Sequence, residues 1–322
     1  MGITRRQFVQ GLALTACASR VSFAAFPERP VTIVVPLAAG GVTDIVARYV
    51  ANQLGQVWKA PIVVENRPGA GGSVGAEYVA KARPDGYTLV MGTVSSHAIN
   101  ASLYQGLRYD NIRDFDPVSL VASGPNLLVV HPSVPVSTLA ELIAYLKANP
   151  GRLSYGSAGV GTSTHVLAEL FKMKTGTEMT HVPYKGSSAM MTDLVAGRVQ
   201  LAFDNMPTAL AQVRSGTLKP IAVSSADRWA EEPGISTMSE TVPGLVATSW
   251  QGLFAPAGTP PQTLDAYAAA LQKILSAQAT TARFRDLGTN AASLSRGEFA
   301  KYVQSETLRW AEVVKASGAR AG

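Results

Sequence analysis

Three glycine-bearing segments are the parts of the chain best suited to chemistry, because each directly follows a predicted strand. They are Pro36–Asp44, Asn66–Gly72 and Tyr155–Thr162. In an open α/β sheet, ligands bind at the carboxyl ends of the strands, and a helix that begins there offers free backbone N–H groups and the positive end of its dipole. Any one segment alone is better explained as a tight turn from strand to helix. Three of them in one chain favour a site for an anion.

The glycine spacing argues against a nucleotide as that anion. Gly156–Thr162 has the spacing of a phosphate-binding loop, but Thr162 stands where such a loop needs lysine. Gly69, Gly71 and Gly75 miss the dinucleotide-binding spacing by one residue. We therefore expect no cofactor.

One string matches a catalytic motif. Gly71–Gly75 reads as the nucleophile elbow of α/β hydrolases, with Ser73 as the nucleophile. That serine must lie on a sharp turn at the end of a strand, whereas Asn66–Ala70 intervenes here. Because Ser73 immediately precedes an amphipathic run, we predict that it caps a helix.

The histidines give no sequence support for a metal site. No two stand at i and i+4 and none lies in an HExxH string; they are His97, His131, His165 and His181. We interpret His131, which precedes a proline, as structural. His165 lies near the start of the helix after the third glycine segment, where a ligand-facing role and a capping or core role both stay open.

Two polar strings at predicted strand ends can line a cleft. His181–Gly186 leaves a strand for a loop, which makes Tyr184 a candidate, while we take Lys185 as solvated. Asp204 ends another strand beside Asn205. A carboxylate would repel an anionic ligand, so Asp204 either contacts an ammonium or hydroxyl group or holds a neighbouring loop. We favour the loop.

Alternating strands and helices must position these residues. β-branched runs such as Val31–Pro36 alternate with helical spacing such as Thr43–Leu54, and a further set opens with a strand at Asn126–His131 and a helix with the capping box Thr138–Glu141. This order predicts α/β layers with largely parallel sheets. The other predicted strands are 62–65, 87–92, 153–157, 180–183, 199–204, 218–224 and 250–255, and the other predicted helices are 73–81, 162–175, 187–196, 262–277, 280–287 and 296–314.

Composition limits the classes of protein that fit. The 322 residues are 47% hydrophobic and 16% charged, which indicates a folded chain of two domains. Lys plus Arg number 28 against 22 Asp plus Glu, but 3 arginines lie in the first 24 residues, which leaves 25 against 22 in the body. The basic residues of the body are scattered and aromatic residues make up only 7%, so we expect no nucleic-acid partner.

The pattern of residues 1–24 predicts an export signal. Arg5 and Arg6 precede an apolar run, Val9–Ala18, that is too short for a permanent membrane anchor. The paired arginines are typical of the twin-arginine route, and an ordinary secretory signal is the alternative. Ser22–Ala24 places cleavage after Ala24.

Cys17 is the only cysteine, so a body that begins near Ala25 has no disulfide and no cysteine-based metal site. Leu14–Cys17 also fits a lipobox, in which Cys17 would be lipidated and would tether the protein. No later stretch is long and apolar enough for a transmembrane helix. We therefore predict a periplasmic protein, soluble or tethered.

Seven strings together resemble the substrate-binding proteins of tripartite tricarboxylate transporters, the family first described as Bordetella uptake proteins. The strings follow the family's order and are Pro36–Asp44 with Ala47-Arg48, Val64–Gly72, Pro84–Leu89, Ser154–Ser157, His181–Gly186, Phe203–Asn205 and Trp250–Pro260. Leu37-Ala38 departs from the family, which commonly has an aromatic residue and a proline there. The detail of that wall is therefore open.

The resemblance implies a periplasmic-binding-protein fold of the second topological type. Two α/β lobes would be joined by a hinge, with a cleft between them and the chain crossing twice. Lobe one would comprise residues 25–123 and 249–322, and lobe two residues 124–248.

The resemblance also implies a ligand site. In this family a ligand carboxylate is typically held by backbone amides and bridging waters from loops of both lobes, without an arginine clamp. Backbone approaches an oxyanion most closely where no Cβ intervenes. The contacts carried over are Ala38, Gly40, Gly41 and Thr43 in lobe one, Ser157, Gly159, Gly161 and Thr162 in lobe two, and Gly69, Ala70, Thr93, Ser95, Tyr184, Asp204 and Asn205 around them.

The implied function is capture rather than conversion. We predict a monomeric exported receptor, not an enzyme, that closes over a small carboxylate and delivers it to the membrane subunits of a tripartite tricarboxylate transporter. The rival hypothesis is an exported α/β hydrolase that uses Ser73 with His181. A ligand-sensing partner of a signalling system is the third.

Overall fold

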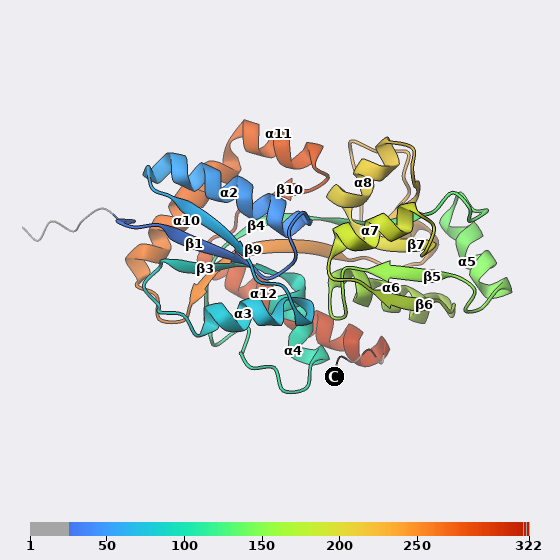
Figure 1. Cartoon of the computed structure of the whole chain (residues 1–322), viewed down its shortest axis with the longest axis horizontal. Helices are drawn as coiled ribbons and strands as arrows, with labels where there is room; N and C mark the ends of the chain where they lie inside the picture. Colours follow the sequence, from blue (N-terminus) through green and yellow to red (C-terminus); the bar gives the residue numbers. More distant parts are fainter. Residues whose placement is uncertain (1–25, 318, 320, 322) are drawn as a thin grey trace, which may run out of the picture.

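The computed structural model describes residues 26–317, 319 and 321. Two α/β lobes lie end to end along the long axis of the molecule (Figure 1). The predictions about the export signal, its cleavage after Ala24 and Cys17 lie outside the described residues. Within the described residues, no helix is both long and apolar enough to cross a membrane.

The elements follow one another in the alternating order that the sequence predicts. They are β1 (Val31–Val35), α2 (Val42–Trp58), β2 (Ile62–Asn66), η1 (Ala70–Gly72), α3 (Ser73–Ala80), β3 (Thr88–Thr93), η2 (Ser95–Ile99), α4 (Asn100–Leu103), β4 (Phe115–Val130), α5 (Leu139–Ala148), β5 (Ser154–Ser157), α6 (Ser163–Thr175), β6 (Thr180–Pro183), α7 (Ser187–Val195), β7 (Leu201–Asn205), α8 (Met206–Arg214), β8 (Lys219–Val223), α9 (Met238–Thr241), β9 (Thr248–Pro256), α10 (Pro261–Ser276), α11 (Gln278–Asp286), β10 (Asn290–Ala291) and α12 (Arg296–Ser317).

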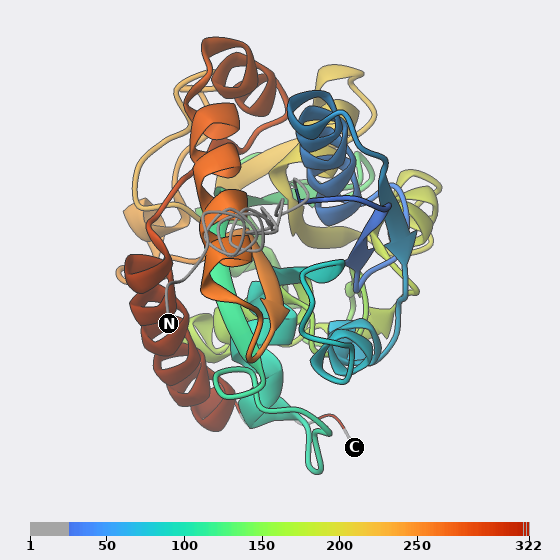
Figure 2. The same ribbon diagram turned by 90° about the vertical axis from the view of Figure 1, so that its left-hand side faces the viewer.

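The sheet of the first lobe is built around β1, whose β-branched residues favour an extended chain. β1 pairs in parallel with β2 and β3, and the antiparallel strands β9 and β4 follow beside β3. Successive residues of β1 face opposite sides. Ile33 packs in one core with α2 and α10, which lie side by side in Figure 2, and Val34 packs in another with α3 and α12.

β4 crosses from one lobe to the other. Its first part, Phe115–Pro125, pairs with β9, and its second part, Asn126–Val130, pairs with β7 and β8. The prediction that this strand begins at Asn126 is wrong, because Asp116-Pro117 and Gly124-Pro125 read as turns in the sequence. The strand tolerates Pro117 because the register against β9 shifts beside it.

Both sheets have the same strand order. The first lobe runs β2-β1-β3-β9-β4 and the second runs β6-β5-β7-β4-β8. In each, the fourth strand arrives from the other lobe, so the chain crosses twice. The predicted two-lobed α/β fold of the second topological type is confirmed.

Helices cover both faces of the second sheet. α5 and α6 share a core with Tyr155, and α7 and α8 share another with Leu127. The predicted capping box Thr138–Glu141 is confirmed at the start of α5. α8 was not predicted from the sequence because it contains Pro207. A proline in the first turn of a helix is tolerated, since its missing N–H has no partner there anyway.

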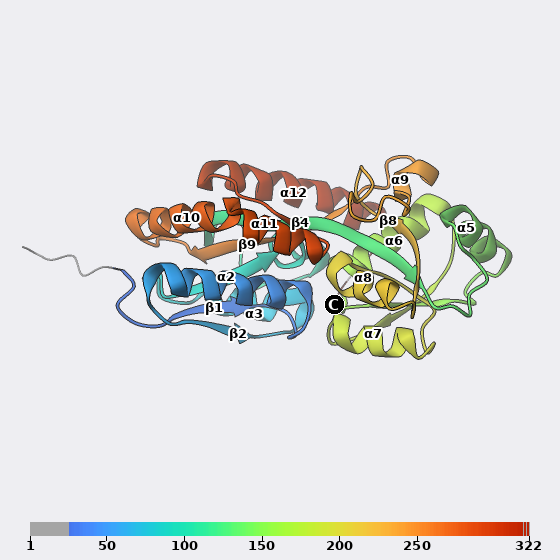
Figure 3. The same cartoon turned by 90° about the horizontal axis from the view of Figure 1, so that it is seen from above.

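The C-terminal helix α12 joins the first lobe to the crossing region. It runs along the first lobe towards the second and packs against α6 (Figure 3). Arg309 donates to the Val246 carbonyl at 2.7 Å. The buried Glu306 accepts the indole N–H groups of Trp250 and Trp310, each at 3.1 Å. The returning strand β9 is thus fastened to α12.

Candidate functional site

The loop between β1 and α2 forms one wall of the site, and its shape depends on Asp44. The Asp44 carboxylate accepts the Gly40 N–H at 3.1 Å and the Asn66 side-chain amide at 3.0 Å. Burial raises the pKa of Asp44, but hydrogen bonds from Arg48, Gly40 and Asn66 outweigh it and lower that pKa overall. The carboxylate therefore stays ionised and paired with Arg48 at 3.0 Å. Asp44 holds the loop without lining the pocket.

The loop between β5 and α6 forms the facing wall and is held from within the second lobe. The Gly159 N–H donates to Ser157 Oγ at 3.2 Å, and the Gly161 N–H donates to His165 Nδ1 at 3.4 Å. The Thr162 N–H donates to the Gly159 carbonyl at 3.2 Å. In this arrangement these amides maintain the loop rather than point at a ligand.

β7 ends at the site with Asp204 and Asn205. Asp204 is fully buried and accepts hydrogen bonds from the hydroxyls of Ser187, at 2.7 Å, and Thr208. Burial raises the pKa of Asp204, and these hydrogen bonds offset that effect only in part. Asp204 fastens the first residue of α7 to the first turn of α8. Asn205 lines the pocket, and its buried Oδ1 has no hydrogen-bond partner among the described residues.

A pocket lies where helices of both lobes begin. α2, α6 and α7 contribute first-turn residues and α8 contributes its N-cap. None of the described residues that line the pocket carries a charged side chain. The lining is Leu37, Ala38, Gly41, Val42, Thr43, Thr93, Val94, Ser95, Ala158, Thr162, Ser163, Thr164, Gly186, Ser187, Asn205, Ser249 and Gln251.

The ends of these helices give the pocket a positive potential. Their N-caps include Gly41 and Gly186, and no cap side chain bonds to the helix among the described residues. By contrast, α5 and α9 carry capping boxes at Thr138 and Thr237, and neither begins at the pocket. First-turn N–H groups lack partners within their own helix, and the dipole adds partial positive charge. The pocket can therefore stabilise an anion without a cationic side chain.

The two lobes touch beside the pocket. The Ser163 N–H of the second lobe donates to Ser95 Oγ of the first lobe at 3.1 Å. The Tyr104 hydroxyl of the first lobe donates to the Val160 carbonyl of the second, also at 3.1 Å. The lobes are therefore in contact through these hydrogen bonds, next to the pocket.

A second cavity adjoins the pocket and shares Leu37, Ala38, Ala158, Thr162 and Gly186 with it. The loops after β2 and β6 supply most of the rest of its wall, and Tyr104, Gly159 and Val160 complete it. Among its described lining residues, the exposed Lys185 is the only charged one. A ligand can thus meet a positively charged side chain, Lys185, in the second cavity but none among the described residues of the pocket.

Most of the ligand contacts expected from the sequence lie at these two cavities. The pocket holds Ala38, Gly41, Thr43, Thr93, Ser95, Thr162 and Asn205, and the second cavity adds Gly69, Ala70, Gly159 and Tyr184. Four expected contacts line neither cavity. These are Gly40, Ser157, Gly161 and Asp204, which contribute to the loop and lobe contacts instead.

Five polar residues of the pocket were not expected from the sequence, and they are Ser163, Thr164, Ser187, Ser249 and Gln251. Ser187 could have been predicted from the sequence. It begins a predicted helix directly after a glycine, and the first glycine segment likewise leads into a predicted helix. Ser249 and Gln251 lie on β9. No local pattern shows that this strand returns to the pocket.

The two groups of the hydrolase hypothesis have separate partners. Ser73 Oγ accepts the Asn100 amide at 2.9 Å, and His181 Nε2 lies 2.7 Å from Ser157 Oγ. The prediction that Ser73 caps a helix is wrong, because Gly72, with φ +96°, is the N-cap of α3. Among the described residues, no group of three His, Cys, Asp or Glu is placed to hold a metal.

Comparisons with known proteins agree with this site. The sequence pattern of the tripartite tricarboxylate transporter family receptor matches residues 45–319. Protein BugT of Bordetella pertussis is 36% identical over 324 residues, which cover 99% of each chain. The structure of R. palustris Rpa4515 with adipate has 39% identity and a TM-score of 0.90, covering 92% of this chain and 99% of that one. MatC (Rpa3494) from Rhodopseudomonas palustris with bound malate has 33% identity and a TM-score of 0.85, covering 90% and 100%.

These matches span both lobes and both crossings of the chain. The family is one of receptors, so the hydrolase hypothesis is wrong. The chain belongs to the tripartite tricarboxylate transporter family of receptors.

Proposed function

We propose that this protein is a periplasmic receptor that captures a small dicarboxylate between its lobes and hands it to the membrane subunits of a tripartite tricarboxylate transporter. We place the lobe boundaries at residues 25–123 with 249–322 and at 124–248. The change of strand partners within β4 after Pro125 supports this division. Closure of the lobes over the ligand would form a composite surface for the membrane subunits to recognise, and the receptor would act as a monomer.

The observation that carries the proposal is a pocket that favours anions without containing a charge. Several helix N-termini converge on it, and none of its described lining residues is charged. Such a site accepts a carboxylate through N–H and hydroxyl donors, and charge-assisted hydrogen bonds are about twice as strong as neutral ones. An amine would be repelled by the same dipoles.

The adjoining cavity supports a ligand with two carboxylates. Lys185 is the charged side chain of its described lining and is available to the far end of a ligand that fills the pocket. The two similar proteins with known ligands hold adipate and malate, which are both dicarboxylates. We therefore expect a second carboxylate to reach the second cavity.

A thermal-shift screen of the exported protein, purified from the periplasm, tests the proposed function. We expect succinate, malate or adipate to raise the unfolding temperature, because a ligand at about 100 times its Kd stabilises by roughly 2.7 kcal/mol. The neutral amide adipamide is the matched control and should give no shift. A shift with amines or sugars and none with any carboxylate would contradict the proposal.

We further propose export by the twin-arginine route, with cleavage after Ala24 and Cys17 left without lipid. Replacing Arg5 and Arg6 by lysines should then hold the precursor in the cytoplasm, as measured by fractionation. Unchanged export would point to the general secretory route.

Labelling with a lipid precursor should leave the protein unmarked, and incorporation that is lost in Cys17→Ala would show that the cleavage site is wrong.

A further inference from the structure

Three aromatic rings stack directly behind the loop between β5 and α6. Tyr155 and His181 lie with ring centroids 4.7 Å apart and planes 15° from parallel, and His181 and His165 lie 4.3 Å apart at 18°. The rings come from β5, β6 and α6. Tyr155 is fully buried and His165 nearly so. The stack is therefore a fixed part of the second lobe next to the pocket wall.

Both imidazoles bond to that loop. Ser157 Oγ accepts the Gly159 N–H at 3.2 Å and lies 2.7 Å from His181 Nε2. The serine hydroxyl has one proton, which it can donate to His181 Nε2 in the tautomer that leaves this nitrogen unprotonated. The Gly161 N–H donates to His165 Nδ1 at 3.4 Å. The Gly161 N–H makes His165 Nδ1 an acceptor, and His181 Nε2 is an acceptor in the tautomer that carries its proton on Nδ1.

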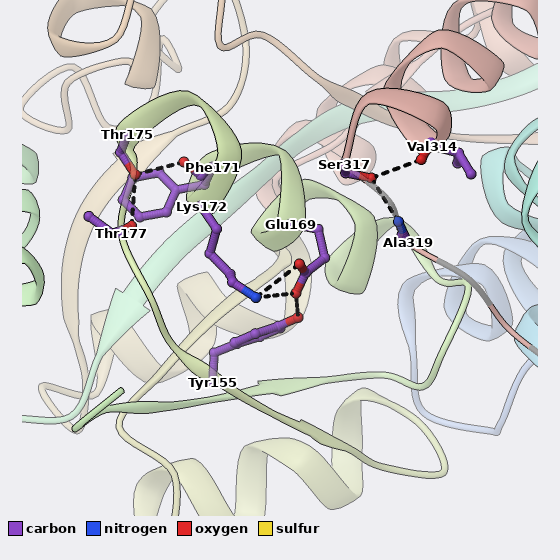
Figure 4. A network of polar contacts seen from close by, with 9 residues as sticks. All are labelled: Tyr155, Glu169, Phe171, Lys172, Thr175, Thr177, Val314, Ser317 and Ala319. Atoms are coloured by element: carbon purple, nitrogen blue, oxygen red, sulfur yellow. Dashed lines mark hydrogen bonds and ion pairs between the residues drawn. The ribbon is translucent and has the colours of Figure 1, made fainter. Parts of the chain in front are cut away.

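Burial keeps the imidazoles neutral, and the nearby charges act in both directions. Lys172 pairs with Glu169 at 2.9 Å, and the Tyr155 hydroxyl donates to Glu169 at 2.5 Å (Figure 4). Burial lowers the pKa of His181 to about 4, aided by the neighbouring His165 and Lys172 and opposed by Glu169. Burial likewise lowers the pKa of His165, where Glu169 opposes and Lys172 assists the shift. Both rings are therefore neutral at pH 7.

We infer that His165 and His181 are positioning residues of the carboxylate pocket, which hold the loop Ser157–Thr162 in shape by accepting its hydrogen bonds in their neutral forms. The inference rests on the proposed function, since it assigns the loop to the wall of that pocket. Protonation turns an acceptor into a donor. An imidazolium at position 165 would point an N–H at the Gly161 N–H and push the loop away. The wall is intact at neutral pH, and it loosens as the pH falls through the pKa values of the folded state.

Nitrogen-15 NMR of the full protein labelled in its histidines tests the inference without any ligand. We expect His181 to be neutral with Nε2 unprotonated from pH 7 to pH 5, and His165 to be neutral with Nδ1 unprotonated at pH 7. The amide signals of Gly159 and Gly161 should move only when these rings titrate. Protonation of either ring at pH 7, or the opposite tautomer of either, would overturn the inference. The proposed function would stand in that case.

Variants test the consequence for binding. His181→Phe keeps a ring in the stack and removes the acceptor, so the affinity for adipate at pH 7 should fall about 5- to 10-fold, the effect of one lost hydrogen bond. His181→Gln restores an acceptor near the position of Nε2 without a titrating group and should bind adipate within about 3-fold of the unchanged protein.

His131 is the matched control. It also bonds to a serine, with Nδ1 2.7 Å from Ser133 Oγ, but it does not line either cavity. His131→Phe should leave the affinity for adipate unchanged. Equal affinities for the His181→Phe variant and the unchanged protein would overturn the inference. Absence of adipate binding in the unchanged protein would instead count against the dicarboxylate proposal, while the NMR result still decides the inference.

Discussion

Gly161→Ala is expected to weaken carboxylate binding about 100-fold while the protein stays folded. A Cβ at Gly161 would lie 2.9 Å from the Tyr104 ring, 3.0 Å from Asn100 Oδ1 and 3.0 Å from a methyl group of Leu103. All three partners belong to the first lobe, whereas Gly161 belongs to the second. The added methyl group therefore clashes with the first lobe only when the two lobes are closed. Overpacking of this kind costs typically about 1–3 kcal/mol.

Gly106→Ala separates this steric effect from backbone strain. Gly161 has φ +83° and Gly106 has φ +78°, so alanine is strained similarly at both positions. A Cβ at Gly106 would meet no described atom within 4 Å. Titration calorimetry with the carboxylate found by thermal shift should show the large loss only for Gly161→Ala. Equal affinities of the two variants would mean that binding does not need the lobes to meet at Gly161.

The fold was predictable because its signals are local. Strands such as β1 are short runs of β-branched residues between turns, and helices such as α5 begin with a capping box that can be recognised in the sequence. The prediction failed where tertiary contacts override local cues. β4 passes through Pro117 and Pro125 because strands from both lobes pair along its length. α8 contains Pro207, which reads as a break but suits a first turn.

The site was predictable only in outline. Glycine segments after strands indicated where an anion would bind, because that signal depends on chain geometry alone. The partners of each group were not predictable. Gly159 and Gly161 were expected to face the ligand, but their N–H groups bond to Ser157 and His165. Sequence shows no such pairing, because it depends on how α6 and β6 pack behind the loop.

The position of Asp204 shows the same limit. Its acidic side chain beside an anion pocket allowed two roles, and the choice between them depends on its neighbours. In the folded chain its oxygens accept the hydroxyls of Ser187 and Thr208. Neither hydroxyl is marked as a partner by spacing in the sequence. The carboxylate thereby serves the pocket indirectly, by fixing the start of α7.

Asn205→Asp is expected to weaken dicarboxylate binding by about 100- to 1,000-fold at pH 7. Asn205 lines the pocket, where none of the described lining residues is charged, and its buried Oδ1 has no partner among the described residues. A carboxylate at this position would lie close to the bound carboxylate. Two like charges about 4–6 Å apart repel by roughly 3–4 kcal/mol at an effective dielectric constant of about 20. The fold should tolerate the change, because aspartate is as good an N-cap as asparagine for α8.

Asn52→Asp is the control for net charge, because Asn52 is exposed on α2 and does not line the pocket. It should leave the affinity for malate and adipate unchanged, as measured by titration calorimetry beside the unfolding temperature of each variant. Binding of adipate to Asn205→Asp as tight as to the unchanged protein would place the ligand carboxylate away from α8. Tighter binding of an amino acid to that variant would show that an ammonium group can lie beside position 205. We expect neither outcome. The helix dipoles favour a negative group in the pocket, so the added carboxylate should compete with the ligand for the same hydrogen-bond donors.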